Sequence, residues 1–126
     1  VFLSQEGWFD EIYFHRVVEG FVAQAGDPSG LGVIGPGYSF ANETDNDLSY
    51  DRAGLVGMAN AGPDTNGSQF FITLAPATNL DGGYSIFGEV TEASLAVLDE
   101  IALRDPQTAV DFTNATQILS VEIIED

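Results

Sequence analysis

A β-hairpin is predicted by the stretch Phe14-His15-Arg16-Val17-Val18-Glu19-Gly20-Phe21-Val22-Ala23-Gln24-Ala25-Gly26-Asp27. Its two apolar runs are separated by a glutamate and a glycine, a pair typical of a tight turn. A two-residue turn places Arg16 opposite Ala23 and on the same face as Phe21. Gln24 then points to the other face, and only a bulge would return it to the side of Arg16.

Short apolar segments recur along the rest of the chain. The sequence has 14 glycines and five prolines, which favours many short strands over a helix bundle. We expect six strands in all, within residues 12–18, 21–25, 55–60, 69–74, 85–90 and 118–124. In the fourth strand, alternation places Gln69 and Phe71 on one face and Phe70 on the other. Six short strands predict a mainly β fold, as a barrel or a sandwich.

One segment has the period of an amphipathic helix. Thr91 suits the N-cap, and the residues after it form one apolar stripe, which consists of Leu95, Val97, Leu98, Ile101 and Ala102. We expect this helix to cover an opening or a flank of the sheet. Residues 1–8 resemble the end of a second helix.

Size and charge limit what the chain can bind. Its 126 residues, 44% of them hydrophobic, are enough for one domain with a single core. Against 20 acidic residues there are three arginines and no lysine, so the net charge is −17. Nucleic acids and anionic membranes are bound by basic patches, so neither is expected as a partner. A surface this acidic suggests adaptation to high salt or an extracellular setting.

The residues used most often in catalysis are scarce. The chain has no cysteine, which excludes disulfides, thiolate metal sites and cysteine nucleophiles but leaves the cytoplasm and a secreted or periplasmic location open. His15 is the only histidine, so a multi-histidine metal centre is excluded. Its position between Phe14 and Val17 favours a packed strand histidine over a metal ligand.

Two motifs match ligand-binding patterns only in part. Residues 30–35 have the glycine spacing of a dinucleotide fingerprint, but Pro36 follows where a helix must begin, so a glycine-rich loop is favoured. Oxygen-bearing side chains alternate in residues 45–51 as in calcium loops, yet Tyr50 and Val56 occupy the glycine and glutamate positions. This excludes an EF-hand and leaves a surface calcium site as the weaker alternative.

Three blocks of sequence, in order, carry a family resemblance. The hairpin stretch resembles the F-H-R-[VI]-[VI]-x-G-F-x-x-Q-x-G-D signature of the cyclophilin peptidyl-prolyl isomerases. The second block, similar to the family's other signature, is Gly57-Met58-Ala59-Asn60-Ala61-Gly62-Pro63-Asp64-Thr65-Asn66-Gly67-Ser68-Gln69-Phe70-Phe71-Ile72. The third is Leu80-Asp81-Gly82 followed by Phe87-Gly88-Glu89-Val90.

The resemblance implies a fold. Members of the family form a closed antiparallel β-barrel with flanking helices, so residues 1–126 are expected to form a single domain of this kind. Family members have two further strands and most of a helix before the point that corresponds to Val1. Without those strands the barrel would be open, with an unpaired edge against residues 118–124.

The resemblance also implies an activity that needs no cofactor. The family rotates the peptide bond before proline, whose barrier is about 18–20 kcal/mol, without breaking any bond. The expected partners are proline-containing peptides and unfolded proteins. A binding module that holds proline peptides in the same groove without turnover is the alternative, and Arg16 favours the enzyme.

By resemblance, Arg16 is the catalytic hydrogen-bond donor, because its guanidinium is always charged and cannot act as a base. The expected substrate-binding residues are Phe21, Val22, Gln24, Ala59, Asn60, Gln69, Phe71, Leu80 and Tyr84. Gln24 is expected to hold Arg16, which conflicts with a two-residue turn and requires a bulge or a wider turn. Asn79 stands where many relatives have tryptophan, so weak cyclosporin binding is expected.

Overall fold

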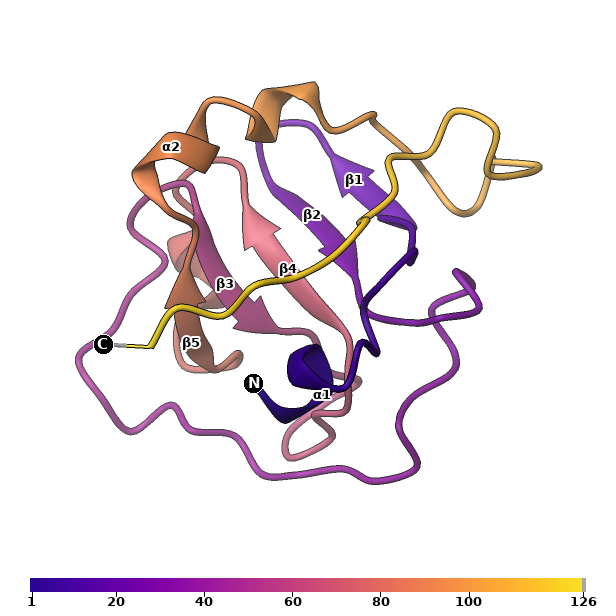
Figure 1. The fold of residues 1–126 in the computed structure, drawn as a ribbon. Helices are drawn as coiled ribbons and strands as arrows, with labels where there is room; N and C mark the ends of the chain where they lie inside the picture. The colour runs from indigo at the N-terminus through magenta and orange to yellow at the C-terminus, as the bar shows by residue number, and fades with distance from the viewer. Residues whose placement is uncertain (126) are drawn as a thin grey trace.

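The computed structural model describes residues 1–125 and consists mainly of one antiparallel sheet (Figure 1). The order of its strands across the sheet is β1-β2-β4-β3-β5. In chain order the strands are β1 (Arg16–Val18), β2 (Val22–Ala25), β3 (Leu55–Met58), β4 (Phe70–Thr73) and β5 (Ile86–Glu89). The expected mainly β fold is confirmed, and five of the six expected strands are present.

The first hairpin has a wider turn than the sequence predicted. Val18 lies opposite Val22, so three residues form the turn, and Gly20 adopts a left-handed φ of 68° within it. This moves the register by one residue relative to a two-residue turn. Arg16 therefore lies opposite Gln24, and Ala23 is on the other face. The predicted pairing of Arg16 with Ala23 is wrong, and the wider turn that the resemblance required is confirmed.

The two faces of the sheet carry separate hydrophobic clusters. The cluster on the first face, which we call the pocket-side core, consists of buried Val22, Tyr50, Leu55, Phe71 and Ala77. The cluster on the other face, the back core, consists of Phe14, Val17, Ala23 and Ala25, with Phe70 and Ile118 packed against it. Phe70 and Phe71 thus enter different cores, as the alternation in β4 predicted.

The predicted helix after Thr91 is broken into two short pieces. These are α2 (Glu92–Leu95) and a 3₁₀ turn, η2 (Leu98–Glu100). Thr91 occupies the N-cap position, but its hydroxyl bonds Ser94 Oγ rather than a backbone N–H. The apolar stripe is divided, because Leu98 is buried whereas Leu95 and Val97 are exposed. With little apolar surface packed, the segment has no tertiary support for a longer helix.

The remaining short helices lie elsewhere along the chain. The expected helix near the N-terminus is present as α1 (Phe2–Gln5). A second 3₁₀ turn, η1 (Thr78–Leu80), precedes β5.

The expected sixth strand over residues 118–124 is wrong. Tyr13 and Gln117 form an isolated antiparallel bridge, and Ile118 N donates to Ile12 O at 2.7 Å. Beyond Ile118, residues up to 125 form no strand, because a strand needs a partner for its backbone groups and none of the described strands pairs with this segment. The C-terminal segment still crosses the sheet, and Ile118 packs on the back core (Figure 1).

Hydrogen bonds do not close the sheet into a barrel. Within residues 1–125, β1 and β5 are its two edge strands. Edge β1 is covered in part by an isolated bridge between Val17 and Arg104. The sheet is thus open, as expected for a barrel of this family without its first strands, but its edges are β1 and β5 rather than a strand at residues 118–124.

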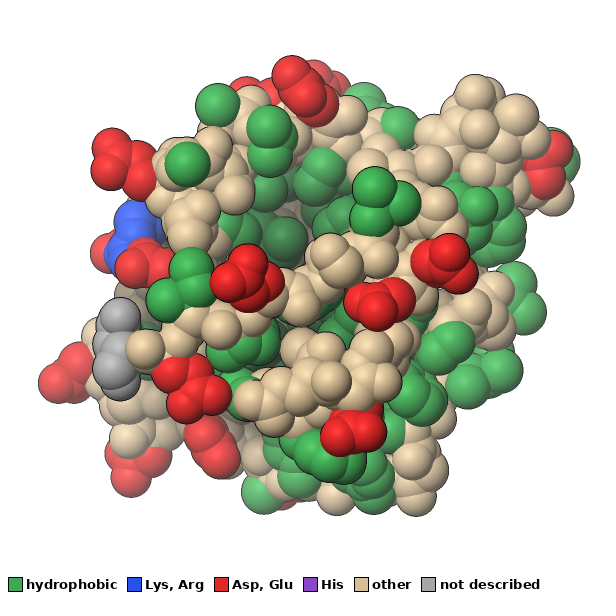
Figure 2. Space-filling model, in the orientation of Figure 1, with side chains coloured by type: hydrophobic (Ala, Val, Ile, Leu, Met, Phe, Trp, Pro, Cys, Tyr) green, Lys and Arg blue, Asp and Glu red, His purple; other side chains and the backbone are tan. Residues whose placement is uncertain are grey.

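The acidic residues of the described chain lie on the surface, except for the buried Asp27. On the face shown in Figure 2, Asp and Glu side chains are spread over the molecule and basic side chains occupy a single small patch. In the part of the chain that the structure describes, no helix is long and apolar enough to span a bilayer.

Candidate active site

A single row of residues crosses the sheet and connects the predicted donor to the predicted pocket. Arg16 in β1 lies opposite Gln24 in β2, and Gln24 lies opposite Phe71 in β4. Phe71 is opposite Gly57 in β3, and Gly57 pairs with Ile86 in β5 next to a register irregularity. Because directly paired residues share a face, Arg16, Gln24 and Phe71 all point to the pocket side.

Gly57 allows aromatic side chains to pack close to this row. A Cβ at this position would overlap Tyr50 Oη and would lie 2.7 Å from Phe71 Cζ. Tyr50 and Phe71 use the space, with their ring centroids 5.4 Å apart. Tyr50 is fully buried, and its hydroxyl donates to Tyr84 O at 3.0 Å.

An apolar surface surrounds Phe71, as the resemblance implied. Phe71 is buried, and Phe21, Leu80 and Tyr84 are half-buried and pack against its cluster. The Tyr84 ring meets Phe71 edge-on, with centroids 5.8 Å apart and an interplanar angle of 82°. Val22 is buried in the same cluster. These five residues give the site an apolar floor of the kind that a proline ring can pack on.

A chain of amides links Gln24 to the neighbouring loop. Gln24 Nε2 donates to Gln69 Oε1 at 2.9 Å, and Gln69 Nε2 donates to Gly32 O at 2.9 Å. Gln24 thus lies opposite Arg16 as expected, but among residues 1–125 no hydrogen bond joins its side chain to the Arg16 guanidinium. The partner of Gln24 is Gln69.

His15 is packed beneath this amide chain. It is buried, as expected for a strand histidine, and its Nε2 lies 3.2 Å from where a Cβ of Gly32 would be. Burial lowers the pKa of His15; the negative charge of Asp27 opposes this effect, and the positive charges of Arg104 and Arg16 add to it, so that the pKa is lowered overall. His15 is therefore neutral at pH 7 and fills space behind Gln69.

A groove of about 340 Å³ lies beside the apolar floor. Four predicted binding residues line it, namely Gln24, Ala59, Asn60 and Gln69. The rest of its lining, which we call the second wall, was not predicted from the sequence and includes Gly32, Val33, Ile34, Gly35, Pro36, Tyr38 and Thr65. The available signal was the glycine-rich stretch 30–35, which forms a loop with no helix after it.

Asp27 shapes that second wall. Its carboxylate accepts hydrogen bonds from Ser29 N and Oγ at 2.7 Å, from Val33 N at 2.7 Å and from Ile34 N at 2.9 Å. Burial by itself would raise the pKa of Asp27, but these hydrogen bonds outweigh it and lower the pKa below its ordinary value. The ionised carboxylate holds the loop of residues 30–35, which we call the groove loop.

The segment between β3 and β4 offers backbone groups at the groove. Ala59 N donates to Gln69 O at 3.0 Å, so this N–H is already used. The Asn60 side chain is also occupied, donating to Gly83 O at 3.0 Å and accepting from Gly62 N at 3.2 Å. In residues 1–125 the Asn60 main chain has no such partner, which leaves it available to an extended ligand.

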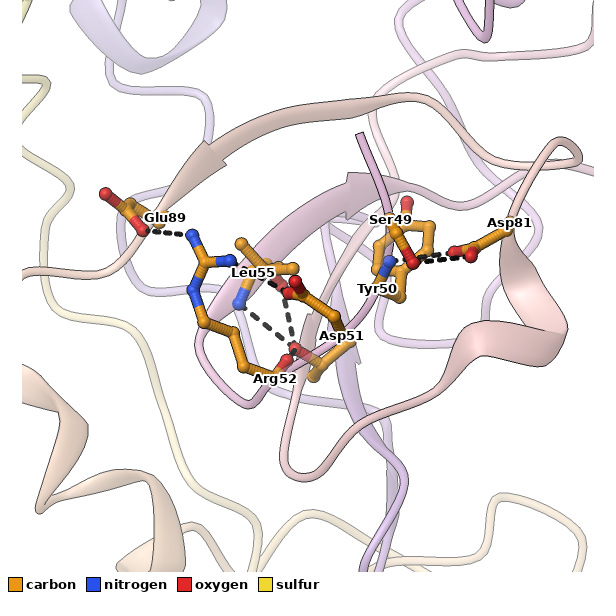
Figure 3. Close-up of polar contacts among 8 residues, drawn as sticks. Ser49, Tyr50, Asp51, Arg52, Leu55, Asp81 and Glu89 are labelled. Atoms are coloured by element: carbon orange, nitrogen blue, oxygen red, sulfur yellow. Dashed lines mark hydrogen bonds and ion pairs between the residues drawn. The ribbon is translucent and has the colours of Figure 1, made fainter. Parts of the chain in front are cut away.

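A carboxylate also fixes the segment that carries Leu80 and Tyr84 (Figure 3). Asp81 accepts from Ser49 Oγ at 2.5 Å and from Tyr50 N at 2.7 Å. The Ser49 hydroxyl and then the Tyr50 N–H lower the pKa of Asp81. Burial raises the pKa of Tyr50, and the negative charge of Asp81 raises it further. At neutral pH the Asp81 carboxyl is therefore ionised and the Tyr50 hydroxyl is protonated. The hydrogen bonds of Asp81 thus hold the segment that carries Leu80 and Tyr84.

The two weaker motifs contribute no ligand cluster. Among residues 1–125, no group of three or more His, Cys, Asp or Glu side chains is placed to hold a metal ion. In the 45–51 segment, Ser49 and Tyr50 instead bond Asp81.

Comparison with known proteins gives a consistent result. The family model for the cyclophilin type peptidyl-prolyl cis-trans isomerase/CLD matches residues 1–123. Peptidyl-prolyl cis-trans isomerase B of Streptomyces anulatus is 43% identical over 123 residues, which are 97% of this chain and 70% of that protein. The probable peptidyl-prolyl cis-trans isomerase A of Mycobacterium leprae is 51% identical over 96 residues, covering 75% of this chain. The match spans about half of that mycobacterial protein, 53% of its length.

A solved structure has the same fold. The cyclophilin type peptidyl-prolyl cis-trans isomerase of Cryptosporidium parvum, crystallised in the presence of the dipeptide Ala-Pro, superposes with a TM-score of 0.82 at 34% identity. The superposition covers 98% of this chain and 81% of that one. The chain described here therefore belongs to the cyclophilin-type peptidyl-prolyl cis-trans isomerase family.

Proposed function

We propose that this chain accelerates rotation about Xaa-Pro peptide bonds, with Arg16 as the hydrogen-bond donor that stabilises the twisted amide. The observation that carries the proposal is the cross-strand row that places Arg16 and Phe71 on one face, with only Gln24 between them. A cation thus lies on the same face of the sheet as an apolar surface.

The chemistry requires only these two features. The amide bond before proline resists rotation because resonance is lost in the twisted state. Phe21, Phe71 and Leu80 hold the proline ring, which leaves the preceding carbonyl free to turn. The Arg16 guanidinium donates to that carbonyl or to the proline nitrogen as it becomes pyramidal, and this favours the transition state over the planar ground state. No bond breaks, so no base or nucleophile is involved.

The remaining residues orient the substrate chain. An extended peptide runs along the 340 Å³ groove, with its backbone against the main chain of Asn60 and the side chain of Gln69. Ala59 contributes van der Waals contact rather than a donor, because its N–H bonds Gln69 O. Tyr84 closes the far side of the proline pocket. The substrates are exposed Xaa-Pro segments in flexible or unfolded chains, in agreement with the Ala-Pro dipeptide used with the Cryptosporidium relative.

Exchange NMR on a short Xaa-Pro peptide distinguishes the enzyme from a module that only binds proline peptides. Both the enzyme and the binding module would broaden or shift the peptide signals at substoichiometric protein. Only the enzyme produces cis–trans exchange cross-peaks within a mixing time of about a second, because uncatalysed exchange takes tens to hundreds of seconds. Shifted signals without cross-peaks would favour the binding module.

Cyclosporin is expected to bind weakly. Asn79 is exposed within η1, beside the Leu80 wall of the pocket, and a small polar side chain offers little apolar surface to a large cyclic ligand. Titration of the isomerase with cyclosporin should therefore give poor inhibition, and the Asn79→Trp variant should be inhibited more strongly. Tight inhibition of the unmodified chain would contradict this expectation.

A further inference from the structure

Arg104 lies along the outer side of β1, next to Arg16. It is far from Arg16 in sequence, yet its main chain pairs with Val17 in an isolated antiparallel bridge. Val17 N donates to Arg104 O at 2.9 Å, and Arg104 N donates to Val17 O at 3.1 Å. An edge strand of three residues thereby gains a partner on its open side.

The Arg104 side chain reaches the peptide unit on the other side of Arg16. Its Nη1 donates to His15 O at 2.7 Å, a short charge-assisted hydrogen bond. The His15 carbonyl belongs to the peptide unit before Arg16, and the Val17 N–H belongs to the one after it. One residue therefore binds both peptide units that flank Arg16.

Aromatic packing holds the Arg104 guanidinium in place. Its Cζ lies 4.4 Å from the centroid of the Phe112 ring, and Nη2 donates to Asp111 O at 3.2 Å. Phe112 stacks on Tyr13, with centroids 4.9 Å apart, and its edge fills the space that a side chain at Gly30 would need. The guanidinium has little freedom to leave the His15 carbonyl.

We propose that Arg104 is a positioning residue for the isomerase reaction, which acts by fixing the backbone from which Arg16 projects. This proposal rests on the proposed role of Arg16 and deepens it. A donor that must meet a developing charge loses effectiveness when it is displaced, and a misplacement of about 1 Å can reduce the rate by about 10²-fold. One edge of β1 pairs with β2. On its other edge, the Arg104 side chain restrains the backbone before Arg16 through its hydrogen bond to His15 O.

The test uses Arg104→Met, which keeps the apolar stem and removes the guanidinium. We expect kcat for an Xaa-Pro peptide to fall by about 10-fold or more, with a smaller change in KM, because the apolar pocket is untouched. Arg104→Lys keeps one charged donor and should recover part of the lost kcat. Arg52→Met is the matched control, because the Arg52 side chain is exposed and, among residues 1–125, its guanidinium pairs only with the surface carboxylates of Asp51 and Glu89. It should leave kcat unchanged.

Arginine NMR gives a second readout that a merely stabilising role would not move. The chain has three arginines and no lysine, so three Nε–Hε signals are expected and the three Arg→Met or Arg→Ala variants assign them. In folded Arg104→Met, the Arg16 signal should shift or broaden, and in Arg52→Met it should not. An unchanged Arg16 signal with unchanged kcat overturns the proposal, as does a fall in kcat that only follows the loss of folded protein in both Arg104 variants.

The two proposals fail in different ways. If the unmodified chain produces no exchange cross-peaks, the proposed isomerase function fails. If the unmodified chain is active and the Arg104 variants behave like the Arg52 control, only the positioning role fails.

Discussion

Gly57 is the residue whose replacement should disturb the pocket most directly without touching the substrate. Its Cα faces Tyr50 and Phe71, and a methyl group there would overlap Tyr50 Oη. We expect Gly57→Ala to lower the free energy of unfolding by about 1–3 kcal/mol, because overpacking forces the two rings apart. Urea denaturation followed by fluorescence measures the change.

Gly88→Ala is the control for this substitution. It lies in the neighbouring strand β5, and a Cβ there would meet only Val56 Cβ at 4.0 Å. Its effect should stay within about 0.5 kcal/mol, since surface changes away from packed features usually do. Equal destabilisation by the two variants would contradict the tight packing assigned to Gly57.

The sequence predicted which residues of this site share a face of the sheet. Arg16, Phe71 and Gln69 lie on one face, as the alternation and the resemblance together required. The interaction of Gln24 could not be read from the sequence. The sequence suggested Arg16 as the hydrogen-bond partner of the Gln24 side chain. In the structure Gln24 lies opposite Arg16 but donates to Gln69 Oε1.

At the element scale, the register of the first hairpin shows what a sequence pattern leaves undetermined. A glutamate and a glycine between two apolar runs fit a two-residue turn, and Phe21 N does bond Val18 O, but Val18 pairs with Val22, so the turn contains three residues. The choice depends on whether Phe21 is needed in the strand or in the pocket-side core, which packs it as a half-buried side chain. Tertiary packing therefore sets the register.

The predictions of a continuous helix after Thr91 and of a strand at 118–124 were wrong for a related reason. Both patterns are amphipathic, and an amphipathic segment needs a surface to pack on or a strand to pair with. Leu98 is buried, whereas Leu95 packs only its tip beside Gly54 and stays exposed, and the helix ends after one turn. Local periodicity predicted which faces are apolar but not how far each element continues.

The groove loop gives a pH-dependent prediction. Asp27 has a lowered pKa, so its hydrogen bonds contribute stability that is fully present above its ordinary pKa of 3.8 and is lost as the pH falls through the lower folded-state value. Asp27→Asn replaces an acceptor with a donor facing backbone N–H groups. At pH 7 we expect it to reduce the free energy of unfolding by about 1–3 kcal/mol.

The difference between the two proteins should shrink as the pH is lowered below 3.8, because the native carboxylate is then progressively protonated. Urea denaturation curves at several pH values measure it. Asp45→Asn is the control, since Asp45 is exposed and has no hydrogen bond to the groove loop among residues 1–125. A difference that is constant with pH would show that Asp27 does not hold the loop as a carboxylate.

For the whole molecule, the net charge of −17 is the dominant long-range term. The acidic groups are spread over the surface and repel one another, and salt shortens the screening length from about 10 Å at 0.1 M to about 3 Å at 1 M. We therefore expect Tm to rise between 10 mM and 1 M NaCl. Calorimetry at several salt concentrations checks this, and a flat or falling Tm would remove the argument for salt adaptation.

The fold class was predictable because three sequence blocks contain β1 and β2 whole, part of each of the other three strands, and most of the pocket residues. The opening of the sheet was expected as well, but the positions of its edges were not. Within residues 1–125 the strands leave β1 and β5 as edges, and the chain spans 70% of the Streptomyces relative. Pairing at those edges depends on long-range contacts, which local patterns do not specify.

The role of Arg16 is the central claim, and kcat/KM for an Xaa-Pro peptide tests it most directly. Removal of a preorganised donor typically costs about 10²–10³-fold, so Arg16→Ala should lose that much activity while its circular dichroism and Tm stay close to those of the unmodified chain. Arg52→Ala should keep full activity, since the Arg52 side chain is exposed and, among residues 1–125, its guanidinium pairs only with Asp51 and Glu89. A folded Arg16→Ala protein with unchanged kcat/KM would contradict the account.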